Sequence, residues 1–189
     1  MTSGSTRDAL LQAAERLVRS RGYSAFSYAD LSDAVGIRKA SIHHHFPAKA
    51  DLGAMLVEDY VARFRDLLAD IRAAEPTALG RLDRYGRIYE ASVRDGMLCL
   101  CGMLATEAQV LPAELRTRIA AFFDQQLDWL EAVLAEGQAA GNVAARGSAR
   151  RAAEHALSAL QGASMVAWGT GRPDVVGRAL DDLLAGLRA

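Results

Sequence analysis

Two short amphipathic segments joined by a tight turn, between Ser27 and Pro47, constrain the fold of this chain more than any other feature. Ser27 with Asp30 three residues later forms the pattern of a capping box, which predicts that a helix starts there. Gly36 ends this helix, because glycine readily takes the left-handed conformation of a helix C-terminus, and Pro47 stops the next one. The segment therefore predicts two short helices packed against each other across a turn.

The remainder of the chain has the spacing of amphipathic helices, with few β-branched runs or alternating segments. Ser5 can cap a helix that Gly22 ends. Proline or glycine punctuation separates further expected helices at about 49–73, 78–95, 98–110, 113–139, 148–169 and 174–188. The pattern predicts an all-α fold of about nine helices.

Positive charge is concentrated in the N-terminal segment, although the whole chain carries a formal net charge of -1. Residues 1–50 hold seven lysines and arginines against four acidic residues, which leaves +3. The other residues hold fifteen against nineteen, which leaves -4. Because nucleic acid attracts a basic surface, only the N-terminal part of the chain suits a phosphate backbone.

The second short helix, expected at residues 39–46, has one apolar side. Ile42 and Phe46 lie one helical turn apart and are expected to be buried. At about 100° per residue, the opposite face carries Ala40, Ser41, His43 and His44. Such a face, held rigid against a neighbouring helix, is typical of helix-turn-helix proteins that enter the major groove of DNA.

Each residue type on this face suits contact with DNA. Alanine lets the backbone approach closely, and serine and imidazole groups bond bases or phosphates. Lys39 adds positive charge at the groove edge. Lys49 lies at the expected start of the next helix, where free backbone amides attract an anion, so we expect a phosphate contact there.

Three segments resemble the DNA-binding signature of the TetR/AcrR family of transcriptional regulators: ADL at 29–31, AVGI at 34–37 and SIHHHFPAKADL at 41–52. The family usually has tyrosines where this chain has His43 and His45, so imidazole contacts would replace phenolic ones and binding would depend on pH near 6 to 7. With the resemblance included, the expected DNA-binding residues are Tyr28, Lys39, Ala40, Ser41, His43, His44, His45 and Lys49.

The resemblance also implies the domain organisation. An N-terminal three-helix helix-turn-helix DNA-binding domain is expected at residues 4–64, with the motif itself at about 27–46. A helical C-terminal domain that binds ligand and dimerises is expected at residues 65–189. A metal site at the three consecutive histidines is the alternative reading of that run, but consecutive helical residues diverge too far to share one ion easily, so we expect no metal.

The last two expected helices carry the predicted dimer interface. The final helix has a wide apolar stripe, and the helix before it has small apolar side chains that permit close packing. Two copies could form a four-helix interface across a two-fold axis. Burial of both faces within one chain is the alternative, whereas the resemblance implies a homodimer that binds two operator half-sites.

The resemblance further implies an effector site inside the C-terminal domain. Large or polarisable side chains with a few polar groups are the candidates for contacting a small molecule. They are Tyr85, Tyr89, Met97, Cys99, Met103, Glu107, Phe122, Gln126, Trp129 and Trp168.

The chain has two cysteines, Cys99 and Cys101. The segment around them is similar to a stretch of the sixth helix in many family members, some of which sense electrophiles or oxidants through a cysteine, and Cys99 matches that position. If both were helical, the two thiols would point about 200° apart and could not form a local disulfide. Two roles for Cys99 are therefore open. It is either a redox or electrophile sensor, activated if Arg94 approaches the thiol, or a buried core residue.

Several classes are not expected from this sequence. We find no nucleophile with a paired base, metal-ligand cluster or phosphate loop, so a helical enzyme is the alternative from another class rather than the prediction, and no cofactor is expected. The longest apolar run, at 97–105, is too short to cross a bilayer, so no membrane partner is expected. The two cysteines, without a recognisable signal peptide, do not suggest a secreted disulfide framework, so the chain is expected to be cytoplasmic. We therefore predict a repressor released from a palindromic operator by an unidentified small-molecule or electrophile inducer; an activating or effector-independent regulator is the alternative.

Overall fold

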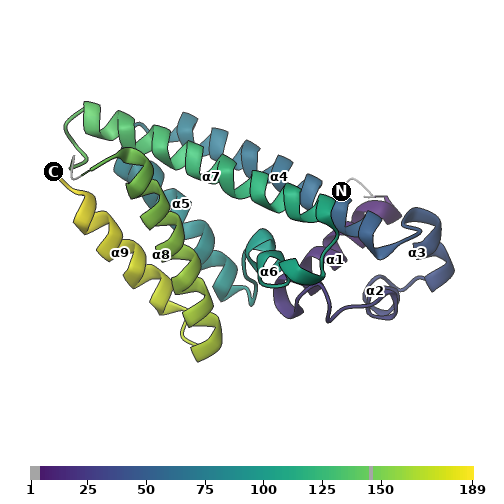
Figure 1. Cartoon of the computed structure of the whole chain (residues 1–189). Coiled ribbons are helices and arrows are strands. Elements are labelled where there is room, and N and C mark those ends of the chain that lie inside the picture. The colour runs from purple at the N-terminus through teal and green to yellow at the C-terminus, as the bar shows by residue number, and fades with distance from the viewer. Residues whose placement is uncertain (1–4, 145–146) are drawn as a thin grey trace. The chain divides into compact units, whose positions relative to one another are not determined.

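The computed structural model describes residues 5–144 and 147–189 (Figure 1). These residues form nine α-helices and one 3-10 turn, and no strand. The elements are α1 (Thr6–Arg21), α2 (Tyr28–Val35), α3 (Lys39–His45), α4 (Lys49–Ala74), α5 (Ala78–Arg94), α6 (Leu100–Thr106), η1 (Ala108–Val110), α7 (Ala113–Ala139), α8 (Ala149–Thr170) and α9 (Asp174–Leu187). The all-α prediction is confirmed.

The predicted helix starts and ends of the N-terminal segment are confirmed in detail. Ser5 and Ser27 each form a complete capping box, with Asp8 and Asp30 as the reciprocal partners. Gly36 follows α2 in the left-handed conformation, at φ 74° and ψ 29°. These are local interactions within four residues, which explains why sequence patterns reveal them.

The helix predicted at 98–110 is wrong in both bounds. The chain leaves α5 through a Schellman motif, in which the amide of Met97 donates to the carbonyl of Ser92 and Gly96 takes φ 68°. Residues 97–99 are consequently not helical, and α6 begins only at Leu100. Cys99 therefore precedes the helix, and the argument that set the two thiols about 200° apart does not apply.

The chain divides into two compact units. Unit 1 comprises residues 1–62 and 100–121, and unit 2 comprises residues 63–99 and 122–189. The predicted division at residue 64 lies close to the first boundary, but the compact units also assign α6, η1 and the start of α7 to unit 1. Helices α4 and α7 contribute residues to both units.

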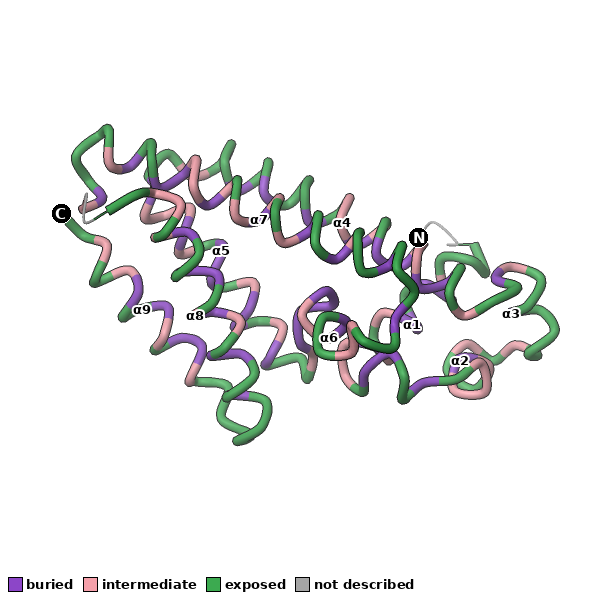
Figure 2. Tube along the Cα trace, in the orientation of Figure 1, coloured by how far each residue is buried: buried purple, intermediate pink, exposed green. Residues whose placement is uncertain are grey.

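Each unit has its own apolar core. In unit 1 fully buried side chains come from α1 to α4 and α6 and include Leu10, Leu31, Ile42, Leu52 and Leu104. In unit 2, helices α5, α8 and α9 pack against one another (Figure 1), and buried positions recur along all three (Figure 2). Gly86 of α5 is needed there, because a Cβ atom at this position would collide with Leu180 of α9.

Candidate DNA interface and effector site

The two helices of the predicted motif pack through a few apolar side chains. Leu31 of α2, Ile42 of α3 and Phe46 just after α3 are all buried. The Ser32 hydroxyl donates to the carbonyl of Ile37 at 2.5 Å and closes the turn between the helices. The buried side chains thus fix one side of each helix in the core of unit 1. The opposite side of α3 is exposed and accessible to a binding partner.

Helix α3 exposes one continuous face. Lys39, Ala40, Ser41, His43 and His44 are all exposed. His45 is half-buried, and its ring meets the ring of His44 edge-on at 5.6 Å. The exposed positions are those expected from the helical period, so α3 presents a polar, hydrogen-bonding surface two turns long. Contact of these residues with DNA stays a prediction.

Tyr28 ties the start of α2 to the end of α3. Its hydroxyl donates to the carbonyl of Phe46 at 2.8 Å, and its ring meets the His43 ring edge-on at 4.8 Å. Burial, with the negative charge of Asp51 adding to it, raises the pKa of Tyr28 to about 12. The hydroxyl is therefore protonated and remains a donor at neutral pH. Nδ1 of His43 lies 3.2 Å from the carbonyl oxygen of Pro47, which orients this ring on the exposed face.

Lys49 points into unit 1, which does not fit the predicted phosphate contact. Its ammonium group donates to the carbonyls of Tyr23 and Phe26, both at 2.6 Å, and lies over both aromatic rings. Burial lowers the pKa of Lys49, and the negative charge of Glu107 opposes this effect. The side chain thus links the start of α4 to the α1–α2 loop.

Glu107, predicted as an effector contact, belongs to unit 1 and binds the same loop. Its Oε1 accepts from the amide of Tyr23 at 2.6 Å and its Oε2 from the amide of Ser24 at 2.8 Å. Partial burial favours the protonated form, but the hydrogen bonds from Ser24 and Tyr23 and the charge of Lys49 outweigh it and lower the pKa of Glu107. The carboxylate is a structural clamp between the end of α6 and the α1–α2 loop.

Glu107→Gln is expected to destabilise the protein by about 1–3 kcal/mol. The glutamine side chain has only one acceptor oxygen, whereas the backbone amides of Tyr23 and Ser24 each need one, and the substitution also removes the negative charge beside Lys49. Urea unfolding at pH 7 measures this difference in free energy. Because the pKa of Glu107 is lower in the folded state than in an unfolded chain, the loss of stability is complete above the unfolded-state pKa and shrinks as the pH falls through the folded-state pKa. Glu114→Gln is the control, because Glu114 forms an exposed ion pair with Arg118. An equal loss of unfolding free energy in both variants would contradict the role of Glu107 as a clamp.

Several aromatic side chains of unit 2 pack against one another. On α7, Phe122, Gln126 and Trp129 follow one another at i, i+4 and i+7 and share one face. Phe122 meets Phe64 of α4 edge-on at 5.4 Å, and Trp129 stacks on Tyr85 of α5 at 5.6 Å with the rings 25° apart. Gln126, between these two contacts on the helix, faces the same aromatic layer.

Two polar groups in this layer have no hydrogen-bond partner. Gln126 is 0% exposed, and neither its amide oxygen nor its amide nitrogen is bonded. Nε1 of Trp129 is buried and likewise unpaired. An unsatisfied buried group costs about 1–3 kcal/mol, so native proteins rarely tolerate one without a functional reason. The neighbouring hydroxyls of Tyr85 and Tyr89, by contrast, bond to each other at 3.0 Å.

The other predicted effector contacts are dispersed. Cys99 is buried in unit 2 at 7% exposure, and Met97 is half-buried. Met103 belongs to unit 1, beside Gly22. Trp168 is 39% exposed on α8. Arg94 binds the carboxylate of Glu90 at 2.5 Å. Phe64 was not predicted, because nothing in its local pattern distinguishes it from an ordinary core residue of α4.

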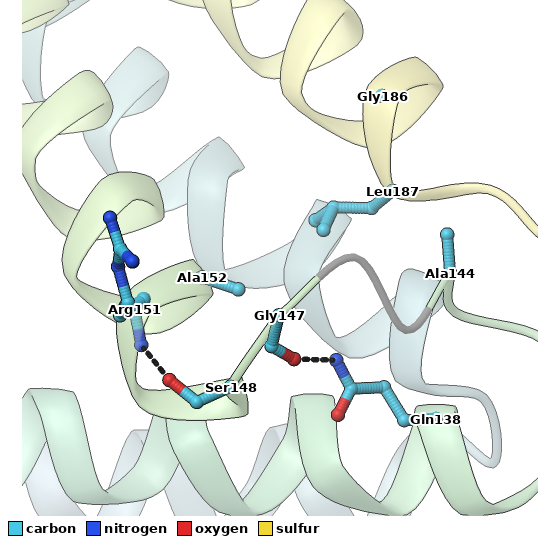
Figure 3. Close-up of a pocket in the computed structure, with 8 residues that line it drawn as sticks. All are labelled: Gln138, Ala144, Gly147, Ser148, Arg151, Ala152, Gly186 and Leu187. Carbon is cyan, nitrogen blue, oxygen red and sulfur yellow. Dashed lines mark hydrogen bonds between the residues drawn. The ribbon is translucent and has the colours of Figure 1, made fainter.

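A pocket of about 340 Å³ lies elsewhere in unit 2, where α7, α8 and α9 have their ends (Figure 3). Two hydrogen bonds join its lining residues: the side-chain amide of Gln138 donates to the carbonyl of Gly147, and the hydroxyl of Ser148 accepts from the backbone amide of Arg151. Its lining is Gln138, Ala144, Gly147, Ser148, Arg151, Ala152, Gly186 and Leu187. No predicted effector contact is among these described residues, so we do not assign the effector to this pocket.

Within residues 5–144 and 147–189, no group of three or more histidine, cysteine, aspartate or glutamate side chains is placed to hold a metal ion. No helix in this part of the chain is both long and apolar enough to cross a membrane.

Two family models match separate parts of this chain. Residues 10–54 match the family described as bacterial regulatory proteins, tetR family. Residues 78–183 match the tetracyclin repressor-like C-terminal domain. The chain belongs to the TetR family. The helices α2 and α3 are its helix-turn-helix. As a member of this family, the chain is a DNA-binding transcriptional regulator rather than an enzyme.

Similar proteins cover most of this chain. The solved structure of a TetR-family regulator from Agrobacterium tumefaciens is 36% identical, with a TM-score of 0.93, over 97% of this chain and 98% of that one. The transcriptional regulator AcuR of Cereibacter sphaeroides is 29% identical over 84% of this chain and 71% of its own length. The HTH-type transcriptional repressor DhaR of Mycobacterium sp. (strain GP1) is 25% identical over 72% and 69%. Regulators of this family bind operator DNA, dimerise and bind small-molecule effectors.

Proposed function

We propose that this chain is a homodimeric repressor that binds a two-fold symmetric operator through α3 and is released when a small molecule binds in unit 2. The exposed polar face of α3, anchored by buried Ile42 and Phe46, is the observation that carries the DNA-binding mode. Its proposed contacts are Lys39, Ala40, Ser41, His43 and His44, with Tyr28 and Lys49 as the residues that hold the motif together. DhaR, a repressor by name, supports the direction of regulation.

The sequence predicted an interface of the last two helices, but Val176, Leu180 and Leu183 of the α9 stripe are buried within the chain. The proposed dimer interface is therefore the outer face of α8. Met165 and Val166 are 52% and 50% exposed, which is unusual for large apolar side chains on a well-formed helix. Gly162 and Gly169 lie on the same face, and a Cβ atom at either would meet no atom within 4 Å. This combination of apolar side chains and glycines suits close packing against a second copy, and two copies double the contacts with DNA.

Selection from a random pool of DNA duplexes tests the operator mode. The expected result is enrichment of a two-fold symmetric site that binds two protomers, with half-sites spaced by about one helical turn. An asymmetric site bound by a single protomer would contradict the proposal. A reporter gene placed behind the selected site separates repression from activation, because a repressor lowers its expression and an activator raises it.

The inducer is proposed to bind without forming a covalent bond. Cys99 is only 7% exposed, which limits access of an electrophile to its thiol. A saturable, reversible loss of operator binding would support this mode. Release by an electrophile that is abolished by Cys99→Ser would instead establish the thiol as the sensor.

Operator affinity is expected to be roughly tenfold higher at pH 6 than at pH 8, at constant salt. His43 and His44 lie on the exposed face of α3. Histidine is the residue type that serves as a pH switch near neutrality, and cationic side chains strengthen binding to phosphates. Fluorescence anisotropy with a labelled duplex measures the affinity. The double variant His43→Gln, His44→Gln is expected to lose most of the pH dependence, and a wild-type affinity that does not change would contradict the imidazole contacts.

A further inference from the structure

The unpaired polar groups of unit 2 define what a bound molecule must offer. The amide of Gln126 presents one donor atom, Nε2 with two N–H groups, and one acceptor atom, Oε1, in the same planar group, and both atoms are unbonded. Nε1 of Trp129 presents a donor one turn further along the same face of α7. A partner that satisfies all three atoms needs an acceptor and a donor side by side, which is the hydrogen-bonding edge of a carboxamide or lactam.

The surroundings of Gln126 favour a flat ring. Phe122 and Trp129 flank it on α7, and their partners Phe64 and Tyr85 come from α4 and α5. Phe64 and Tyr85 also meet edge-on at 6.4 Å, so the four rings form one continuous layer. Aromatic rings favour stacked or edge-on contacts with another ring.

Among the residues that the structure describes, no buried charged side chain is left without a partner. Glu90 is the only buried charged side chain among the described residues, and its two carboxylate oxygens are bonded to Arg87 and Arg94. Burial raises the pKa of Tyr85, so this hydroxyl is neutral at pH 7. A carboxylate or ammonium group placed beside Gln126 would lose its hydration without gaining an opposite charge.

We propose that the effector is an uncharged, ring-bearing carboxamide or lactam, which bonds Gln126 and Trp129 through its amide edge and packs its ring on the layer of Phe64, Tyr85 and Phe122. This inference deepens the proposed function and rests on unit 2 being the effector site. Gln126 and Trp129 determine which chemical class binds, and the aromatic layer contributes affinity without selecting a polar group.

Four probes of nearly equal shape test this class: benzamide, acetophenone, benzoate and cumene. The chain has two tryptophans, so the indole N–H region of a ¹⁵N spectrum has two signals, which Trp168→Phe assigns. Benzamide is expected to shift the Trp129 signal and to bind at least tenfold more tightly than benzoate, with acetophenone between them. Benzoate binding as tightly as benzamide, or a response of Trp168 alone, would overturn the proposal.

The variant Gln126→Leu keeps the volume of the side chain and removes both unpaired groups. It is expected to fold, to lose at least tenfold in benzamide affinity and to bind cumene at least as well as the wild type. Gln125→Leu is the matched control, because it makes the same change at the neighbouring, half-buried position of α7. An unchanged benzamide affinity in Gln126→Leu, or an equal loss in both variants, would overturn the assignment.

A final measurement separates this inference from the proposed function. The probe titrations contain no DNA, so they report the chemical class alone. Addition of the selected operator then reports release. If benzamide binds as expected but operator affinity is unchanged at saturation, the effector role is contradicted, whereas the proposed chemical class of ligand is still supported. If a charged compound releases the operator and its binding is unaffected by Gln126→Leu, the proposed chemical class is overturned, whereas the repressor proposal is still supported.

Discussion

Ala40→Glu is expected to lower operator affinity by about 100-fold or more, because each half-site loses roughly 1–3 kcal/mol and the dimer makes both contacts. Ala40 is exposed on α3, opposite the buried Ile42. A carboxylate there would face phosphate oxygens and the acceptor atoms of base edges, and its larger side chain would prevent close approach of the helix. Anisotropy with the selected duplex measures the loss.

The fold should not respond to this change, because Ala40 packs against nothing that the motif needs. The expected unfolding midpoint of Ala40→Glu is therefore that of the wild type. Ala105→Glu adds the same charge at an exposed position of α6, also in unit 1, and controls for net charge. If Ala105→Glu weakens binding as much as Ala40→Glu, the effect is general electrostatics and α3 is not the reading helix.

Val166→Glu is expected to weaken the dimer by about 100-fold or more and to give monomers at micromolar concentration. Val166 and Met165 lie between two exposed glycines on the outer face of α8. In a two-fold interface each substitution appears twice, so two carboxylates would be buried without opposite charges. Sedimentation equilibrium measures the association constant.

Loss of the dimer also predicts a change in DNA binding. The variant should bind the selected operator only at higher protein concentration and with a steeper concentration dependence, because two monomers must then assemble on one site. Ala91→Glu, at an exposed position of α5, is the control in the same unit. A stable Val166→Glu dimer would contradict the assignment of α8 to the interface.

Local patterns predicted the helices well because the interactions that define them are themselves local. The capping boxes at Ser5 and Ser27 and the left-handed Gly36 act within four residues of the chain. The inward Ile42 and the outward face of α3 follow from the helical period alone. The helix whose predicted bounds differ most from the structure is α6, which follows a Schellman motif. The glycine of this motif was identified as a break, but the later start of α6 by two residues was not predicted.

Long-range contacts had no such signal. Glu107 was grouped with the effector contacts by its position, yet it binds amides 83 and 84 residues away in unit 1. Lys49 was assigned to phosphate because it starts a helix, yet its ammonium group finds two carbonyls of the preceding loop. Charged side chains have several possible partners, and only packing determines which of them is near.

The helix-turn-helix of this TetR-family chain, with its buried anchors and exposed α3 face, was thus determined by the sequence through caps, glycines and period. Tertiary structure decided which side chains remain for function. It directs Lys49 and Glu107 to the clamp inside unit 1, and it leaves the amide of Gln126 buried without a partner among the aromatic rings of unit 2. The physical reason is that hydrogen-bond satisfaction in a core depends on atoms from separate helices, which no single stretch of sequence specifies.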